Sequence, residues 1–494
     1  MKTYFRLSTM TSLLIIVILM SLSVAAIPAA ASGKPPTATP SGPTPTPGSG
    51  GTADIVVSGT QWGVSTCNIG ANEGSALFNV ADLTDIGFNT YRLYGGMSRW
   101  EPNDDDGVYG SPSIAQIKAN INLIPWATWD NLMINPPNGT DYWWSDTTSV
   151  PVNAVTIFTN LKNAGIKPVV VLRNRDNNNR PAWMTANPTT TADYNEWWEH
   201  VFATVYWFNV RNNYGVDDWE IHNEPNNQSQ GYGGTITDYY TFAQQTNDAI
   251  QYVYATYLPG RTPHVSAPAT TTGSSWPRDV MINAGAYFTD VDIHNYDVDT
   301  TTYNQKVHGW MNQNGKPNAP LWLTEIGEWR QNKYDTASFA NDVLIANTLR
   351  GSRPGLDYVS GSHIFSFYDW TTYQSGLIHG MTGTGTKTPG YYALRLATRG
   401  LQGCKATYQA AESQSFVEAL ATKDSLGKVY LIVNNASQGS KTLTADLSAL
   451  IVSGTGTQWQ FDSTHNDTIT GSPILSNGRV TFTVLGHGTV LLRF

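Results

Sequence analysis

Short apolar runs and longer amphipathic segments alternate along most of the chain. The strand candidates are Gln61–Thr66, Thr90–Tyr94, Lys167–Arg173, Asp217–His222, His264–Pro268, Val291–His294, Leu321–Thr324 and Ser362–Phe367. Segments with a helical period lie between them, for example Asp193–Asn213 and Thr237–Tyr257. Strands that alternate with helices in this way over residues 53–402 predict an α/β fold, a closed parallel (β/α)8 TIM barrel. An open doubly wound sheet is the alternative, but no glycine-rich phosphate turn follows the first run.

The pattern changes after residue 402. The remaining segment contains short strand-like runs separated by Gly, Asn, Ser and Asp, for example Lys428–Asn434, Lys441–Leu447 and Arg479–Val484. This spacing is typical of antiparallel sheets with tight turns, so residues 403–494 predict a small C-terminal antiparallel β-sandwich domain. We expect this domain to be a structural companion of the barrel rather than a separate binding module.

Two segments at the N-terminus do not suit a folded core. The apolar run Leu13–Ala26 follows a basic start and is followed by small residues that end at Ala31, so residues 1–31 predict a cleaved signal peptide. Residues 32–52 are rich in Pro, Thr, Gly and Ser and predict an extended linker. We therefore expect a secreted, extracellular protein without membrane association after cleavage.

Composition narrows the range of partners. The chain has 29 basic and 38 acidic side chains, a net charge of −9 and no evident basic patch, so we do not expect nucleic acid as a partner. Its 17 Trp and 25 Tyr residues suit stacking against sugars, because the C–H faces of pyranose rings lie well on indole rings.

The chain contains two cysteines, Cys67 and Cys404. Cys67 is expected to follow the first strand and Cys404 the last helix, which places them toward opposite ends of a barrel. A protein of this size does not need a disulfide framework. We therefore expect two unpaired thiols.

Two glutamates stand at the ends of predicted strands. Glu224 lies in WEIHNEPN and Glu325 in PLWLTEIG. Enzymes with this barrel keep their reactive groups at the carboxyl ends of the strands. Cleavage of a glycosidic bond needs one carboxyl group to protonate the leaving oxygen and a second one to attack the sugar carbon or activate water. The two positions therefore predict a glycosidase in which Glu224 and Glu325 are catalytic.

Other polar residues lie near these glutamates. Asn223 and Glu224 can both face the pocket only if the strand end is bulged or already turning, and the Asn223 amide could then bind a sugar 2-hydroxyl. Glu220 lies deeper on the same face as Glu224, where a paired interior carboxylate is expected. Arg92, on the second predicted strand, has Glu325 as its natural partner.

The strand Val291–Tyr296 and the segment after the eighth strand supply further candidates. His294 and Tyr296 share a face, and a tyrosine hydroxyl that donates to Glu325 would keep a nucleophile ionised. Trp370, in FSFYDW, could form the floor of a sugar site. The alternatives are a satisfied core histidine for His294, a surface residue for Tyr296 and ordinary packing for Trp370.

These motifs resemble clan A of the retaining glycoside hydrolases, and within it families 5 and 39. The resemblance runs from about Gln61 to the C-terminus and rests on WEIHNEPN, HNY, LWLTEIG and FYDW. It implies a (β/α)8 barrel with an acid/base on strand four, preceded by Asn, and a nucleophile at the end of strand seven. Carried onto this chain, the acid/base is Glu224 and the nucleophile Glu325, with substrate-binding residues Asn223, Arg92, His294, Tyr296 and Trp370. Family 39 usually has Trp in place of His222, and Glu328 is a rival nucleophile.

Retaining hydrolysis by double displacement is the preferred hypothesis, and it requires no metal or organic cofactor. The expected partner is a polysaccharide or oligosaccharide of the plant cell-wall type, such as xylan, mannan or β-glucan, and the protein is expected to be a monomer. Inverting hydrolysis and transglycosylation are mechanistic alternatives. A non-catalytic glycan-binding barrel and a metal-dependent hydrolase that uses His222 and His294 are alternatives of a different class.

Overall fold

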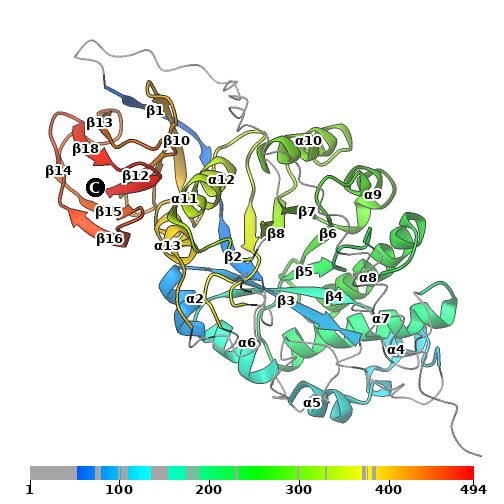
Figure 1. The fold of residues 1–494 in the computed structure, drawn as a ribbon. Helices are drawn as coiled ribbons and strands as arrows, with labels where there is room; N and C mark the ends of the chain where they lie inside the picture. The colour runs from blue at the N-terminus through cyan, green and yellow to red at the C-terminus, as the bar shows by residue number, and fades with distance from the viewer. Residues whose placement is uncertain are drawn as a thin grey trace, which may run out of the picture. The chain divides into compact units, whose positions relative to one another are not determined.

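The computed structural model describes most of the chain after residue 52 (Figure 1). The described residues are 53–72, 79–97, 101, 109–134, 154–174, 181, 184, 188–227, 232–296, 300–328, 331–369, 374, 376–380 and 385–494. The predicted signal peptide, the predicted linker and Trp370 lie outside these residues. Among the described residues, no helix combines the length and the apolar character that crossing a membrane requires.

Eight parallel strands form a closed barrel in the order β2-β3-β4-β5-β6-β7-β8-β9, which confirms the predicted fold. Their bounds are β2 Asn68–Asn72, β3 Thr90–Gly96, β4 Lys167–Arg173, β5 Asp218–Ile221, β6 His264–Thr270, β7 Asp290–Tyr296, β8 Leu321–Gly327 and β9 Gly361–Ile364. Most of these strands are buried along almost their whole length, as expected where helices cover the outside of a parallel barrel.

Helices connect the strands and surround the barrel (Figure 1). Their bounds are α2 Val80–Ile86, α4 Ile114–Ala119, α5 Trp126–Ile134, α6 Ala154–Asn163, α7 Thr191–Tyr206, α8 Ile236–Tyr257, α9 Trp276–Ala284, α10 Thr300–Gln313, α11 Ala337–Phe339, α12 Ala346–Gly351 and α13 Pro389–Leu401. Two short π-helical segments, η2 Trp207–Arg211 and η5 Ala340–Ile345, extend α7 and join α11 to α12. Helix α8 begins with a capping box between Thr235 and Asp238, which satisfies two backbone N–H groups at its start.

The prediction that Gln61–Thr66 is the first barrel strand is wrong. Gln61 to Val64 belong to β1 (Ile55–Val64), which pairs antiparallel with β10 and parallel with β13 in the second sheet (Figure 1). The barrel begins instead with β2, whose sequence NIGAN has little of the β-branched and aromatic character of a strand. Close packing of Gly70 against Thr90 places β2 beside β3, so tertiary contacts decide the position of this strand.

The second sheet has nine strands in the order β16-β15-β19-β12-β11-β10-β1-β13-β18. The strands after the barrel are β10 Ala406–Glu412, β11 Val417–Lys423, β12 Val429–Asn435, β13 Lys441–Asp446, β15 Thr457–Phe461, β16 Asn466–Gly471, β18 Arg479–Val484 and β19 Gly488–Arg493, with β14 Gly454–Thr455 and β17 Ile474–Leu475 as a separate pair. Strands β12 and β19 share one hydrophobic core with β13 and β18, so the sheet curls over its own core. The predicted β-domain is therefore present, and it takes one strand from before the barrel.

The two faces of this sheet bury different partners. Leu431 and Val433 of β12 point into the core of the β-domain, whereas Ile432 between them packs with α12 and α13 of the barrel. Leu491 of β19 lies on the same outer face and is fully buried. Strand alternation thus gives a sheet that is apolar on both faces, and the β-domain is packed against barrel helices.

The prediction of two unpaired thiols is also wrong. Cys67 and Cys404 form a disulfide with a Cα–Cα distance of 4.2 Å. The error follows from the misplaced first strand: Cys67 precedes β2 rather than following the first barrel strand. Cys67 and Cys404 therefore lie at the same, amino-terminal end of the barrel, where the disulfide ties the start of the barrel to the residues just before β10.

Candidate active site

A fully buried arginine forms the base of a polar cluster inside the barrel. Arg92 is on β3, and its Nε donates to Glu220 on β5 at 2.7 Å, while its Nη2 donates to the other oxygen of the same carboxylate. Both side chains have no exposed surface. A buried charge needs a partner, so this bidentate pair fixes the guanidinium plane. The expectation that Glu220 is a paired interior carboxylate is confirmed.

The same guanidinium reaches Glu325 at the carboxyl end of β8. Arg92 Nη1 donates to Glu325 Oε1 at 2.8 Å. Strand β8 bulges here, because Leu323 and Glu325 pair with consecutive residues of β7 and Thr324 is left without a partner in that ladder. A bulge changes which face of the strand a side chain takes, and this one lies directly before Glu325.

Two tyrosines complete the donors around Glu325. Tyr94 donates to Oε1 at 2.9 Å, and Tyr296 donates to Oε2 at 2.6 Å. Burial by itself would raise the pKa of Glu325, but the charges of His294 and Arg92 and the two tyrosine hydrogen bonds lower it below its ordinary value. Glu325 is therefore held ionised in a buried position, as a nucleophile requires.

The second glutamate lies on the turn that follows β5. His222 and Glu224 both have left-handed backbone conformations, with φ of 64° and 42°. This turn allows neighbouring residues to face the same pocket: Asn223 Oδ1 accepts from Arg92 Nη2 at 2.9 Å, and Glu224 Oε1 contacts His294 Nδ1 at 2.9 Å. The condition that the strand end must already be turning is met.

The two glutamates converge on one small space. Ligand atoms of Glu224, His294 and Glu325 all lie within 4.8 Å of one another, and His294 Nδ1 is 3.4 Å from Glu325 Oε2. The Glu224 and Glu325 side chains are 11 % and 7 % exposed, so both are largely buried and each keeps a small accessible surface. Burial would lower the pKa of His294, but the charge of Glu325 and the contact with Glu224 raise it. One oxygen of Glu224 lies within 4.8 Å of one oxygen of Glu325, which fits the carboxyl pair of a retaining glycosidase, about 5–5.5 Å apart, better than the pair of an inverting one, about 6.5–9.5 Å apart.

The hydrogen-bond donors are unequally divided between the two carboxyl groups. Glu325 accepts from Arg92, Tyr94 and Tyr296, whereas Glu224 has His294 on one oxygen and Asn227 Nδ2, at 3.0 Å, on the other. Donors stabilise the ionised form of a carboxyl group. The arrangement therefore favours negative charge on Glu325.

The structure brings together Glu224, Glu325, Asn223, Arg92, His294 and Tyr296, while Trp370 lies outside the described residues. Sequence reasoning missed Tyr94, although its spacing of two from Arg92 on one strand puts both on the same face. It also missed Asn72, whose Oδ1 accepts from Arg92 Nη1 at 2.7 Å, because the strand that carries it was not identified.

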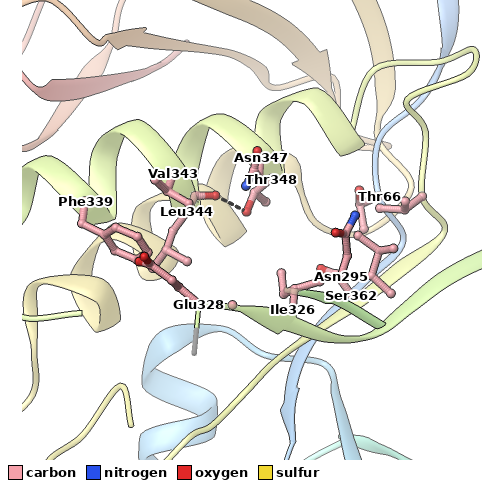
Figure 2. A pocket seen from close by; sticks show the side chains of 13 residues that line it. Thr66, Asn295, Ile326, Glu328, Phe339, Val343, Leu344, Asn347, Thr348 and Ser362 are labelled. Carbon is pink, nitrogen blue, oxygen red and sulfur yellow. Dashed lines mark hydrogen bonds between the residues drawn. The ribbon is translucent and has the colours of Figure 1, made fainter. Parts of the chain in front are cut away.

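The rival nucleophile Glu328 is in a different place. It follows β8 and lines a cavity of about 350 Å³ on the outer side of the barrel wall, under the helical segment from α11 to α12 (Figure 2). The apolar side chains of this cavity are Leu323, Ile326, Phe339, Val343, Leu344 and Val359. Arg92, Glu224 and Glu325 do not line it, so Glu328 is separated from the polar cluster.

The metal-dependent alternative required His222 and His294 to act together. His222 is fully buried, its Nδ1 lies 2.8 Å from the backbone oxygen of Asn223, and its ring packs edge-on against Tyr232. Among the described residues, the group able to hold a metal ion is Glu224, His294 and Glu325, without His222. The structure therefore does not bring His222 and His294 together as ligands of one metal ion.

No protein-family model and no curated protein matches the chain in sequence. Solved structures resemble it in fold. A GH30 endoxylanase from Clostridium papyrosolvens has 15 % identity and a TM-score of 0.61, with coverage of 89 % of this chain and 99 % of that one. An α-L-arabinofuranosidase from Thermotoga maritima has 13 % identity, a TM-score of 0.59 and coverage of 90 % and 100 %. A GH39 enzyme from Xanthomonas axonopodis pv. citri has 14 % identity, a TM-score of 0.57 and coverage of 89 % and 96 %. The likeness spans both the barrel and the β-domain and is a likeness of fold.

Proposed function

We propose that the protein is a secreted retaining glycoside hydrolase that cleaves β-linked polysaccharides or oligosaccharides of the plant cell wall. The observation that supports this most directly is the pairing of two carboxyl groups within 4.8 Å, one of which, Glu325, accepts from an arginine and two tyrosines. Glu325 is the nucleophile and Glu224 the acid/base. Arg92, Tyr94 and Tyr296 hold Glu325 ionised and aimed.

In the first step a Glu325 oxygen forms a bond to the anomeric carbon. The bond from that carbon to the leaving oxygen breaks, and the leaving oxygen takes the proton of Glu224. The result is a glycosyl ester on Glu325, a released alcohol or shortened chain, and an ionised Glu224. Because the charge of Glu325 has been consumed in the ester, Glu224 can now exist as a carboxylate next to it.

In the second step Glu224 takes a proton from water, and the water oxygen attacks the anomeric carbon from the face that the leaving group vacated. The ester bond breaks, Glu325 returns to its ionised form and Glu224 is protonated again. Two inversions give net retention of configuration. Asn223, held by Arg92 beside the pocket, is placed to bind the sugar hydroxyl next to the reacting carbon.

The substrate class rests on composition and on the fold relatives. Abundant Trp and Tyr suit neutral sugar rings. The fold relatives include an endoxylanase and an α-L-arabinofuranosidase, so xylan and arabinose-substituted xylan are the first substrates to test. Mannan and β-glucan complete the panel.

The test is proton NMR of the first sugar product from each polysaccharide of that panel. We expect the β-anomer to form first from a β-linked substrate, and then to mutarotate. Glu325→Gln and Glu224→Gln should each remove most of the turnover, whereas Glu328→Gln, the matched control, should not. First appearance of the α-anomer, or full activity of Glu325→Gln, contradicts the proposal. Secretion is tested separately by mass spectrometry of the exported protein, which should begin after Ala31.

A further inference from the structure

A buried aspartate near the two glutamates has no role in the steps described above. Asp292 is on β7, two residues before His294 and on the same face, and has no exposed surface. Ser266 Oγ donates to its Oδ2 at 2.8 Å, and the backbone N–H of Ala269 donates to its Oδ1 at 2.5 Å. Both partners are on β6, so Asp292 ties two neighbouring strands together inside the barrel.

Ala269 is an unusual residue of β6. Pro268 and Thr270 pair with consecutive residues of β7, so Ala269 is an extra residue in the ladder. Its φ is 44°, in the left-handed region that an alanine rarely adopts. Such a conformation persists only where the surroundings fix it, and the bond from its N–H to Asp292 is one of the contacts that do so.

The carbonyl of Ala269 connects this bulge to the acid/base. It accepts the backbone N–H of Glu224 at 2.9 Å. Glu224 itself has a left-handed φ of 42°. The chain of contacts therefore runs from Asp292 through the backbone N–H and C=O of one residue of β6, Ala269, to the backbone N–H of Glu224, and it joins two left-handed residues.

We propose that Asp292 is a positioning residue that fixes the backbone of Glu224 through Ala269 and so aims the Glu224 carboxyl group at the leaving oxygen. This inference rests on the proposed function. Removal of Asp292 frees the N–H of Ala269, lets the bulge relax and moves the carbonyl that holds Glu224. The nucleophile is anchored elsewhere, by Arg92 and Tyr296, and keeps its place.

The chemical state of Asp292 suggests which substitution preserves this role. Burial and the charge of Glu220 raise its pKa well above the ordinary value, although the bonds from Ser266 and Ala269 oppose this. A neutral carboxyl group offers one acceptor and one donor, as a carboxamide does. Asp292→Asn therefore retains an oxygen for the N–H of Ala269 and places an NH2 group at Ser266 Oγ, which can accept.

The experiment compares Asp292→Leu, Asp292→Asn and a control on the same strand. Asp290→Leu is matched, because Asp290 is also a buried aspartate of β7 but stands at the amino-terminal start of that strand, where it accepts from Trp322 Nε1 at 3.0 Å. Each variant is assayed on two aryl glycosides of the same sugar, one with a good leaving group and one with a poor leaving group. Only the poor leaving group depends strongly on protonation.

General acid catalysis contributes a factor of ~10²–10⁴ to the rate, and Asp292→Leu should remove part of it. We therefore expect the loss of kcat/KM for the poor leaving group to exceed the loss for the good one by a factor on the order of 10 to 100. Asp292→Asn should restore most of this loss, and Asp290→Leu should affect both substrates equally. Equal losses for both leaving groups in Asp292→Leu overturn the proposal. If Asp292→Leu does not fold, Asp292→Ser supplies the same test, since its hydroxyl is too short to reach Ala269.

A crystal structure of Asp292→Leu gives a readout that needs no substrate. We expect Glu224 Oε1 to move away from His294 Nδ1, while Glu325 keeps its bond to Arg92. An unmoved Glu224 overturns the positioning role even if no glycoside is cleaved. A displaced Glu224 in a protein that cleaves no glycoside supports the positioning role and contradicts the proposed function instead, so the two failures are distinguishable.

Discussion

Tyr296→Phe removes one hydrogen bond from the ionised form of Glu325 and leaves the aromatic ring in place. The lost bond, from the tyrosine hydroxyl to Oε2, is 2.6 Å long and lies in a partly buried site. Burial raises the pKa of Tyr296, as does the charge of Glu325, so the hydroxyl remains a donor throughout the working pH range. The substitution therefore tests how much a single donor contributes to the ionisation of the nucleophile.

The size of the effect follows from the charge on the acceptor. A hydrogen bond to a charged group contributes about 1.5–3 kcal/mol, and one pKa unit corresponds to about 1.4 kcal/mol, so loss of this bond should raise the pKa of Glu325 by about 1 to 2 units. The pKa of Glu325 in the folded protein lies below the ordinary value of 4.5. The ionised form of Glu325 is therefore present above pH 4.5 and is lost as the pH falls through the lowered pKa. In Tyr296→Phe this loss begins at a higher pH.

The assay is the pH dependence of kcat/KM on an aryl glycoside with a good leaving group, which reports the free enzyme. The acid limb should move to higher pH by about 1 to 2 units, while the activities at neutral pH differ less. Tyr94→Phe is the matched control: its hydroxyl donates to Oε1, which Arg92 also binds, so its shift should be smaller. An acid limb at the same pH in Tyr296→Phe and the wild type refutes the reasoning.

Three further predictions concern stability. Arg92→Met leaves Glu220 buried without its partner and should lower the free energy of unfolding by about 3–5 kcal/mol in urea titrations, whereas adding Glu220→Gln should restore part of the stability but no activity. Cys67→Ser opens a disulfide that spans 337 residues and should lower the free energy of unfolding by about 2–5 kcal/mol. Reducing agent should lower the stability of the wild type by the same amount and leave that of the variant unchanged. A further loss of stability in the reduced variant would contradict the pairing of Cys67 with Cys404. Leu491→Ala should lower the free energy of unfolding by about 2–5 kcal/mol, because the side chain is fully buried between the β-domain and the barrel helices. An unchanged melting temperature would argue against that interface.

Local sequence signals were sufficient for the barrel and for the two glutamates. The run Lys167–Arg173 is continuously apolar between its two charged ends, which is typical of a buried parallel strand. Glu224 and Glu325 follow such runs directly, and the carboxyl ends of all strands in a parallel barrel meet at one face. The fold class therefore places both glutamates at the same end of the barrel.

Pairing between distant segments was not available from the sequence. Gln61 to Val64 have the composition of a barrel strand, but their hydrogen-bond partners lie in β10, far along the chain. The weak sequence of β2 hid the true first strand, and with it the position of Asn72 and the proximity of Cys67 to Cys404.

The sequence by itself determined which residue types stand at the strand ends and therefore which chemistry the site can perform. Only the tertiary structure decided how the donors are divided, because the Arg92, Tyr94 and Tyr296 contacts to Glu325 join different strands. It also decided the backbone geometry at Glu224, which depends on a bulge of β6 held by Asp292 of β7. The periodicity of a sequence indicates which face a residue takes within its own strand. Bulges and left-handed turns depend on contacts between strands, so a local sequence pattern does not predict them.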